Sequence, residues 1–169
     1  MVLATPNSLI ELFSEISEPL ALSPDGEIVP HILFSCPDDG SVDANLRPAT
    51  VGDGVAVQVK ADRTTPWISL NIGFNLEELV GLDYLGIHAV TQSAAAITTE
   101  VCFRQHNEIG FIDATFRKHI ISYEQHSSHL DQLALAEHLL PNCTKAELIL
   151  FFESREFLLN IAKLKLFAV

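Results

Sequence analysis

The sequence predicts a mainly β protein, an antiparallel β-sandwich or barrel with one short N-terminal helix, on three observations. Apolar residues alternate with polar ones over many short segments, as they do in strands that bury one face. Turn-forming residues such as Asp39-Gly40 separate these segments at short intervals. Long helical patterns do not alternate with the strands, which argues against a parallel βαβ sheet. The 169 residues predict a single domain over 1–169.

The predicted helix lies at the N-terminus. Ser8 followed by Glu11 matches a capping box, in which side chains bond the free backbone amides of the first turn. Apolar residues then recur at helical spacing, namely Leu9, Leu12, Phe13 and Ile16. Pro19 ends the pattern, because proline lacks the amide that a helix interior needs.

Strands are predicted downstream, where the apolar period becomes two. Val55, Val57 and Val59, for example, alternate with Ala, Gln and Lys. The predicted strands cover 55–60, 67–72, 84–89, 97–104, 109–116, 118–125, 146–153 and 157–167. The segment 130–140 fits neither period, and we expect a strand there, followed by a helical turn that ends at Pro141.

Acidic residues outnumber basic ones, with 22 Asp and Glu against 10 Lys and Arg and a net charge of -12. Eight of the acidic residues lie in 1–46, which has no basic residue; we interpret it as an acidic segment with the first strands, and 50–169 as the sandwich core. Phosphate backbones and anionic membranes attract clustered Lys and Arg, so we expect neither nucleic acid nor a membrane as a partner. The hydrophobic content of 48% excludes a disordered acidic tail.

The chain as given matches neither a signal peptide nor a spanning helix, because no basic residue precedes Arg47 and no apolar run approaches roughly 18 residues. A cytoplasmic location is the default expectation, although a processed secreted domain would show the same pattern. Three widely spaced cysteines, without a Cys-x-x-Cys pair, predict free thiols rather than a disulfide framework or a zinc site.

Three histidines that lie close in the sequence are candidate metal ligands, namely His119, His126 and His129. The chain has neither a His-x-His pair nor a His-Glu-x-x-His helix, and it lacks the Gly-x-Ser-x-Gly pattern of a nucleophile elbow. We therefore expect no metal, no cofactor and no catalytic residue. A metal-dependent enzyme that uses these three histidines is one alternative.

A candidate ligand site follows from the facing of the strands. If the valine, leucine and isoleucine positions face the core, the alternating positions face solvent together. The residues that this predicts to bind a ligand are Trp67, Asn71, His88, Glu100 and Arg104, with Gln58 beside them. Such mixtures bind sugars, because an aromatic ring covers the apolar sugar face and planar polar groups bond pairs of hydroxyls. A solvated sheet face of similar composition is the competing interpretation.

Two stretches resemble a known group of domains. Segment 76–89, with Gly81, Tyr84 and Leu85, resembles the Gly-x-x-Tyr-Leu strand entry of jelly-roll carbohydrate-binding modules and galactose-binding-like domains. The segments 146–152 and 157–167 are similar to their paired last strands. The resemblance covers 50–169 and implies a jelly-roll fold with a carbohydrate partner. These families often hold a structural calcium at an aspartate before the last strand; this chain has Asn160, so the calcium does not carry over.

The sequence thus favours a non-catalytic carbohydrate-binding module that recognises a sugar or glycan on one sheet face. A homo-oligomeric interaction or assembly domain is the first alternative, since charged residues make up only 19% and obligate interfaces resemble domain cores. The metal-dependent enzyme is the second.

Overall fold

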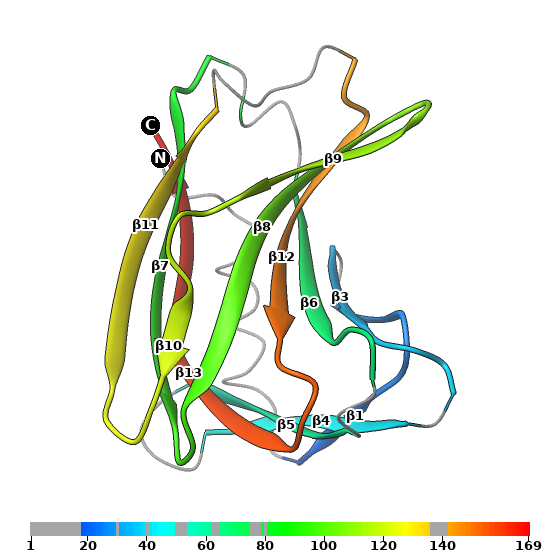
Figure 1. Ribbon diagram of the computed structural model, residues 1–169, viewed down its shortest axis with the longest axis vertical. Helices are drawn as coiled ribbons and strands as arrows, with labels where there is room; N and C mark the ends of the chain where they lie inside the picture. The colour runs from blue at the N-terminus through cyan, green and yellow to red at the C-terminus, as the bar shows by residue number, and fades with distance from the viewer. Residues whose placement is uncertain are drawn as a thin grey trace.

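The computed structural model describes residues 18–29, 31–39, 41–49, 54–61, 65–74, 79, 81–135 and 142–169. Their strands pack as two layers (Figure 1). In chain order the strands are β1 (Leu20–Leu22), β2 (Gly26–Val29), β3 (Ile32–Ser35), β4 (Val42–Pro48), β5 (Val55–Ala61), β6 (Ser69–Phe74), β7 (Tyr84–Ser93), β8 (Ile97–Asn107), β9 (Gly110–Thr115), β10 (Ile120–Ser122), β11 (Ser127–Ala134), β12 (Lys145–Phe152) and β13 (Phe157–Ala168).

Two antiparallel sheets make up the sandwich. Sheet A has the strand order β1-β4-β5-β13-β7-β11. Sheet B has the order β10-β8-β12-β6-β3-β2, and β9 shares with β10 the edge of β8 that β12 leaves free. From β5 to β8 and again from β11 to β13, each strand lies in the sheet opposite its predecessor. This crossing between layers is the jelly-roll arrangement, and the predicted fold class is confirmed.

The core lies between the sheets, where the apolar alternates of both meet. Leu46 and Ile87 of sheet A and Ile72 and Phe103 of sheet B are all essentially buried. Burying one such side chain contributes roughly 1.5–3 kcal/mol. The period-two pattern of the sequence therefore corresponds to one buried face per strand.

The predicted strands from position 55 onward are all present, with ends that differ by a few residues. Residues 20–48 add four strands, and Ile32 and Phe34 of β3 belong to the core. The ambiguous segment begins within β11, as expected, whereas the helical turn predicted before Pro141 lies outside the described residues. The predicted N-terminal helix lies outside them too. Among the described residues, no helix has the length and apolar character needed to cross a membrane.

One premise of the sequence analysis is wrong. The outward positions of β5, β6, β7 and β8 do not share a face, because β5 and β7 belong to sheet A and β6 and β8 to sheet B. The outer face of sheet A therefore carries His88 and Gln58. The outer face of sheet B carries Asn71, Glu100 and Arg104. Alternation shows which residues face the core, but it holds no information on which sheet a strand joins.

Candidate functional site

The predicted ligand residues divide between the two sheets. Asn71 on β6 and Glu100 and Arg104 on β8 occupy outer positions of sheet B, which is confirmed by their register with outer positions of β12. Trp67 lies two residues before β6 and is 44% exposed. His88 lies on β7 of sheet A, paired with Lys165 of β13. Whether these five residues bind a ligand stays a prediction.

On the outer face of sheet B, Arg104 is held by a carboxylate. Its Nε and Nη2 atoms donate to the two carboxylate oxygens of Asp113 on β9, each at 2.7 Å. The guanidinium also lies over the Phe111 ring, 4.0 Å from its centroid. The bidentate hydrogen bond raises the pKa of Arg104 and lowers that of Asp113, so both groups stay charged.

Other polar side chains of this face are paired as well, among them Glu147 and Asn71. Glu147 is almost buried, and its two carboxylate oxygens lie 2.6 Å from His106 Nε2 and 3.5 Å from Lys145 Nζ. The Ser69 hydroxyl donates to Asn71 Oδ1 at 2.8 Å. Three of the polar groups of this sheet face, Arg104, Glu147 and Asn71, thus have partners within it, and a ligand would have to displace those partners.

The outer face of sheet A differs, because strand register aligns a row of polar side chains, and some of their buried atoms have no hydrogen-bond partner among the described residues. Arg47 of β4 lies opposite Ala56 of β5, which lies opposite Asn160 of β13, which lies opposite Gln92 of β7. Arg47 Nε and Gln92 Oε1 are buried and have no hydrogen-bond partner in the described part of the chain, and the same holds for Asn45 Oδ1, two residues from Arg47 on the same face of β4. The Gln92 amide cannot gain by flipping, since its Nε2 already donates to the Glu124 carbonyl at 2.7 Å.

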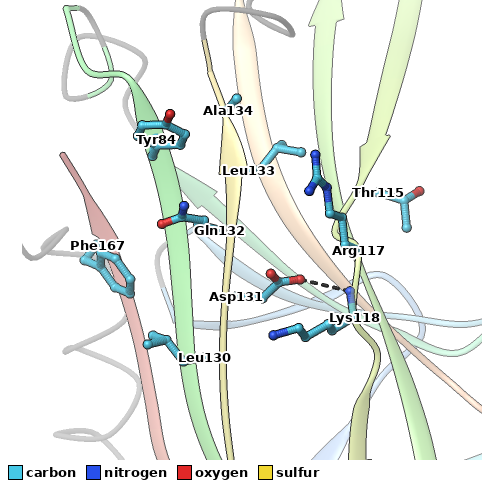
Figure 2. A pocket seen from close by; sticks show the side chains of 10 residues that line it. All are labelled: Tyr84, Thr115, Arg117, Lys118, Leu130, Asp131, Gln132, Leu133, Ala134 and Phe167. Carbon is cyan, nitrogen blue, oxygen red and sulfur yellow. Dashed lines mark hydrogen bonds between the residues drawn. The ribbon is translucent and has the colours of Figure 1, made fainter.

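The same face continues into a cleft of about 750 Å³ around the free edge of β11 (Figure 2). Tyr84, Leu130, Gln132 and Phe167 lie on one side of β11, where strand register places them on the outer face of sheet A. Its lining residues are Tyr84, Thr115, Arg117, Lys118, Leu130, Asp131, Gln132, Leu133, Ala134 and Phe167. A second cavity of about 180 Å³ continues along β11 and shares Lys118, Leu130 and Asp131 with the first.

A glycine shapes the apolar part of this cleft. Gly86 lies between Phe167 of β13 and Gln132 of β11, and a Cβ atom there would approach the Phe167 ring to 2.2 Å. The far end of the ring therefore lies directly over the backbone of Gly86. Next to it, Tyr84 is 41% exposed and Leu130 even more so. Together these three side chains form a partly exposed apolar platform on a sheet face that is otherwise polar.

His88 is the one predicted ligand residue on this face. It lies in register between Lys165 and Leu130, and its Nε2 is 3.2 Å from the Ser128 hydroxyl. Burial lowers the pKa of His88, and the positive charges of Lys163 and Lys165 lower it further. A neutral imidazole at neutral pH both donates and accepts hydrogen bonds.

Tyr84, Gln92 and Phe167 also lie on the outer face of sheet A, and none of them was identified from the sequence. Tyr84 and Gln92 occupy outward alternates of β7, just as His88 does, so their facing could have been found from the pattern. Phe167 could not, because a break in the alternation of β13 precedes it. Its position depends on pairing with Gly86, a residue far away in the sequence.

The three histidines of the metal hypothesis do not form a site in the part of the chain that is described. His129 Nε2 lies 2.9 Å from the Ile121 carbonyl, and His119 and His126 are exposed. Within the described residues, no three or more His, Cys, Asp or Glu side chains gather closely enough to hold a metal ion.

Solved structures of carbohydrate-binding modules share this fold. A family 4 module matches over 98% of this chain and 100% of its own, with a TM-score of 0.59 and 12% identity. The CBM22-1 xylan-binding domain of Paenibacillus barcinonensis Xyn10C matches over 91% and 96%, with a TM-score of 0.57 and 10% identity. A family 11 module of Clostridium thermocellum, in complex with a β-1,3-1,4-mixed-linked tetrasaccharide, matches over 88% and 94%, with a TM-score of 0.52 and 11% identity.

No protein-family model and no curated protein sequence matches the chain. The structural matches confirm the resemblance to jelly-roll carbohydrate-binding modules that was found in segments 76–89 and 146–167. At 10–12% identity they establish the fold alone.

Proposed function

We propose that this protein is a non-catalytic carbohydrate-binding module that holds a glycan on the outer face of sheet A, beside the edge strand β11. One observation carries the proposal: unpartnered buried polar atoms and a partly exposed apolar platform occur together on one sheet face. The jelly-roll neighbours, one of them a xylan-binding domain and another bound to a tetrasaccharide, support the same class of ligand.

The chemistry of the face fits a sugar chain. Pyranose rings present an apolar face, which Tyr84, Phe167 and Leu130 can cover, and the burial of aromatic rings dominates such contacts. Hydroxyl groups at the ring edge both donate and accept, so they can satisfy Gln92 Oε1 and Asn45 Oδ1 on the donating side and Arg47 Nε on the accepting side. A buried polar atom left unpaired costs about 1–3 kcal/mol, and a bound hydroxyl offsets this cost once the half-buried side chain turns toward the ligand.

The experiment compares one aromatic residue on each sheet. Tyr84 and Trp67 are about equally exposed, at 41% and 44%, and both are replaced by alanine. Binding of a polysaccharide panel is measured by affinity electrophoresis and calorimetry. We expect Tyr84→Ala to weaken the tightest interaction at least about tenfold, from the lost burial of the ring, and Trp67→Ala to leave it unchanged.

The reverse result, with loss only in Trp67→Ala, would move the site to sheet B and to the residues predicted from the sequence. Arg104→Ala is then the next variant, because Arg104 belongs to that predicted set. Failure of every glycan to bind the wild-type protein would refute the proposal altogether.

A second candidate function is a homo-oligomeric assembly domain, and the β8–β9 hairpin supports it. The hairpin extends past the neighbouring strands (Figure 1), and Ile109 at its tip is 94% exposed, with Phe111 and Ile112 about half exposed. If the hairpin mediates self-association, sedimentation of the wild type shows an oligomer that Ile109→Ser dissociates. Ile121→Ser, at another exposed position on β10, serves as the control. A wild type that stays monomeric at high concentration excludes this candidate.

A further inference from the structure

The positive charges of this acidic protein fall into two groups. Nine of its 10 Lys and Arg residues, all but Arg63, are in the part of the chain that the structure describes. Four of them form ion pairs with carboxylates, namely Lys60, Arg104, Lys145 and Arg155. The other five have no ion-pair partner among the described residues, namely Arg47, Arg117, Lys118, Lys163 and Lys165.

These five unpaired cations lie on the outer face of sheet A or across its edge strand β11. Arg47, Lys163 and Lys165 occupy outer positions of sheet A. Arg117 and Lys118 line the cleft on the far side of β11, in the segment before β10 (Figure 2). Three of the five described cations without an ion-pair partner therefore lie on the face proposed to bind a glycan, and the other two line the cleft beside it.

A β-bulge directs two of these lysines onto the face. Leu159 and Ile161 of β13 point into the core, so strict alternation would send Lys163 and Lys165 inward as well. The register shifts between Ile161 and Lys163, and beyond the shift Leu164 and Leu166 are buried instead. The extra residue of a bulge reverses the facing of everything after it, and such bulges commonly re-aim side chains at functional sites.

Carboxylates are scarce at the described outer positions of sheet A. Asp43 is at its end and pairs with Lys60, with Nζ and Oδ2 3.8 Å apart. Asp131, at the β11 edge, accepts the backbone amide of Lys118 at 2.9 Å. No other Asp or Glu occupies an outer position of this sheet within the described strands. The lowered pKa of His88, caused first by burial and then by Lys163 and Lys165, is consistent with a positive potential here.

We propose that the glycan bound by this face is anionic and carries carboxylate or sulfate groups, as uronic acids and sulfated sugars do. The inference rests on the function proposed above and specifies its ligand. Lys163 and Lys165 contact the anionic groups, while the platform of Tyr84, Phe167 and Leu130 covers the sugar rings. The net charge of -12 repels polyanions from the rest of the molecule, so affinity for an anionic chain requires a local site of this kind.

The test uses the full chain and three groups of probe in affinity electrophoresis and calorimetry. Polygalacturonate and alginate carry carboxylates, chondroitin sulfate and heparin also carry sulfates, and xylan and mixed-linked β-glucan are neutral. We expect at least one anionic probe to bind about tenfold or more tightly than both neutral probes. Its affinity should fall as NaCl rises from about 0.1 M to about 1 M, where the screening length shortens to roughly 3 Å.

Substitutions of Lys163 and Lys165 test whether these two lysines bind the anionic groups. Lys163→Gln with Lys165→Gln removes two positive charges from the face and should weaken anionic binding at least about tenfold, whereas Lys163→Arg with Lys165→Arg should preserve it. The control, Lys145→Gln with Arg155→Gln, removes the same net charge from residues that pair with Glu147 and Glu153. Unfolding midpoints verify that each variant is folded.

The outcomes separate the two proposals. Equal or tighter binding of a neutral glycan overturns the anionic ligand and leaves the carbohydrate-binding function standing. Binding of no probe at all overturns both. Anionic binding that survives in the Lys163 and Lys165 glutamine variant, or that the control variant weakens equally, also overturns this inference.

Discussion

Arg104, His106 and Asn71 on the outer face of sheet B each have a partner on that same face. On the outer face of sheet A, Arg47 and Gln92 each keep a buried polar atom without one. The two faces use similar residue types, so composition does not distinguish them. Residues that satisfy one another stabilise the fold, whereas residues left unsatisfied are available to a ligand. That difference, rather than the number of polar residues, assigns the candidate site to sheet A.

One buried thiol, that of Cys102, also belongs to the face of sheet B. Cys102 lies on β8 beneath the Arg104 and Asp113 pair, and burial raises its pKa to about 12. It therefore stays protonated near neutral pH and acts as a small apolar side chain of sheet B.

The largest difference between the two sheets is expected when one glycine in each is replaced by alanine. Gly86→Ala on sheet A forces a Cβ atom into the Phe167 ring and should lower the free energy of unfolding by about 1–3 kcal/mol, as overpacking does. It also displaces the ring from the platform and so weakens glycan binding. Gly73→Ala on sheet B has its nearest contact at 3.5 Å, and we expect no loss of stability there. Urea unfolding measures both.

Equal stability of the two alanine variants would show that Phe167 can move aside without cost. The platform would then not be fixed by Gly86, and the packing argument for the cleft would fail.

A smaller effect is expected when an arginine on each face is replaced by methionine, which keeps much of the aliphatic stem. Arg104→Met leaves Asp113 without its bidentate partner, and because both groups are partly exposed we expect a loss of only about 1 kcal/mol. Arg47→Met removes a buried Nε that has no partner, so its loss should stay within about 0.5 kcal/mol. Chemical unfolding at neutral pH gives both values.

The stability that the Arg104 and Asp113 pair contributes should depend on pH. The hydrogen bond from Arg104 depresses the pKa of Asp113 in the folded state below its ordinary value of 3.8. The pair therefore stabilises the fold above that value, and the contribution is lost as pH falls through the depressed folded pKa. The stability gap between wild type and Arg104→Met should close in acid. A gap that stays constant down to low pH would contradict the ion-pair explanation.

Several features were within reach of sequence reasoning. The strands β5 to β10, β12 and β13 follow from local alternation, and Tyr84 could be assigned an outward position on β7 from the same pattern. The jelly-roll resemblance came from short stretches at the start of β7 and in the last two strands. The pattern correctly placed four predicted ligand residues at or near outer positions, namely Trp67, Asn71, Glu100 and Arg104. His88 does not share their face, because β7 belongs to the opposite sheet.

The parts that sequence reasoning missed depend on contacts between distant segments. The bulge in β13 turns Lys163 and Lys165 outward against the simple alternation, and only pairing with β7 reveals it. The Phe167 ring depends on Gly86, and the unpaired state of Gln92 Oε1 depends on every neighbour that fails to reach it. Neither a ring contact nor an absent hydrogen bond has a sequence signature.

The sequence by itself determined the β class, most strand positions and which residues are buried in the strands that alternate without a bulge, because the facing of side chains is a local property of an extended backbone. Only the tertiary structure decided which sheet each strand joins, and so which outward residues share a face. Strand pairing is made between segments far apart in the chain, and local periodicity is the same on either sheet. For this protein that choice separates a self-paired face from one with open cations, unpartnered amide oxygens and an apolar platform.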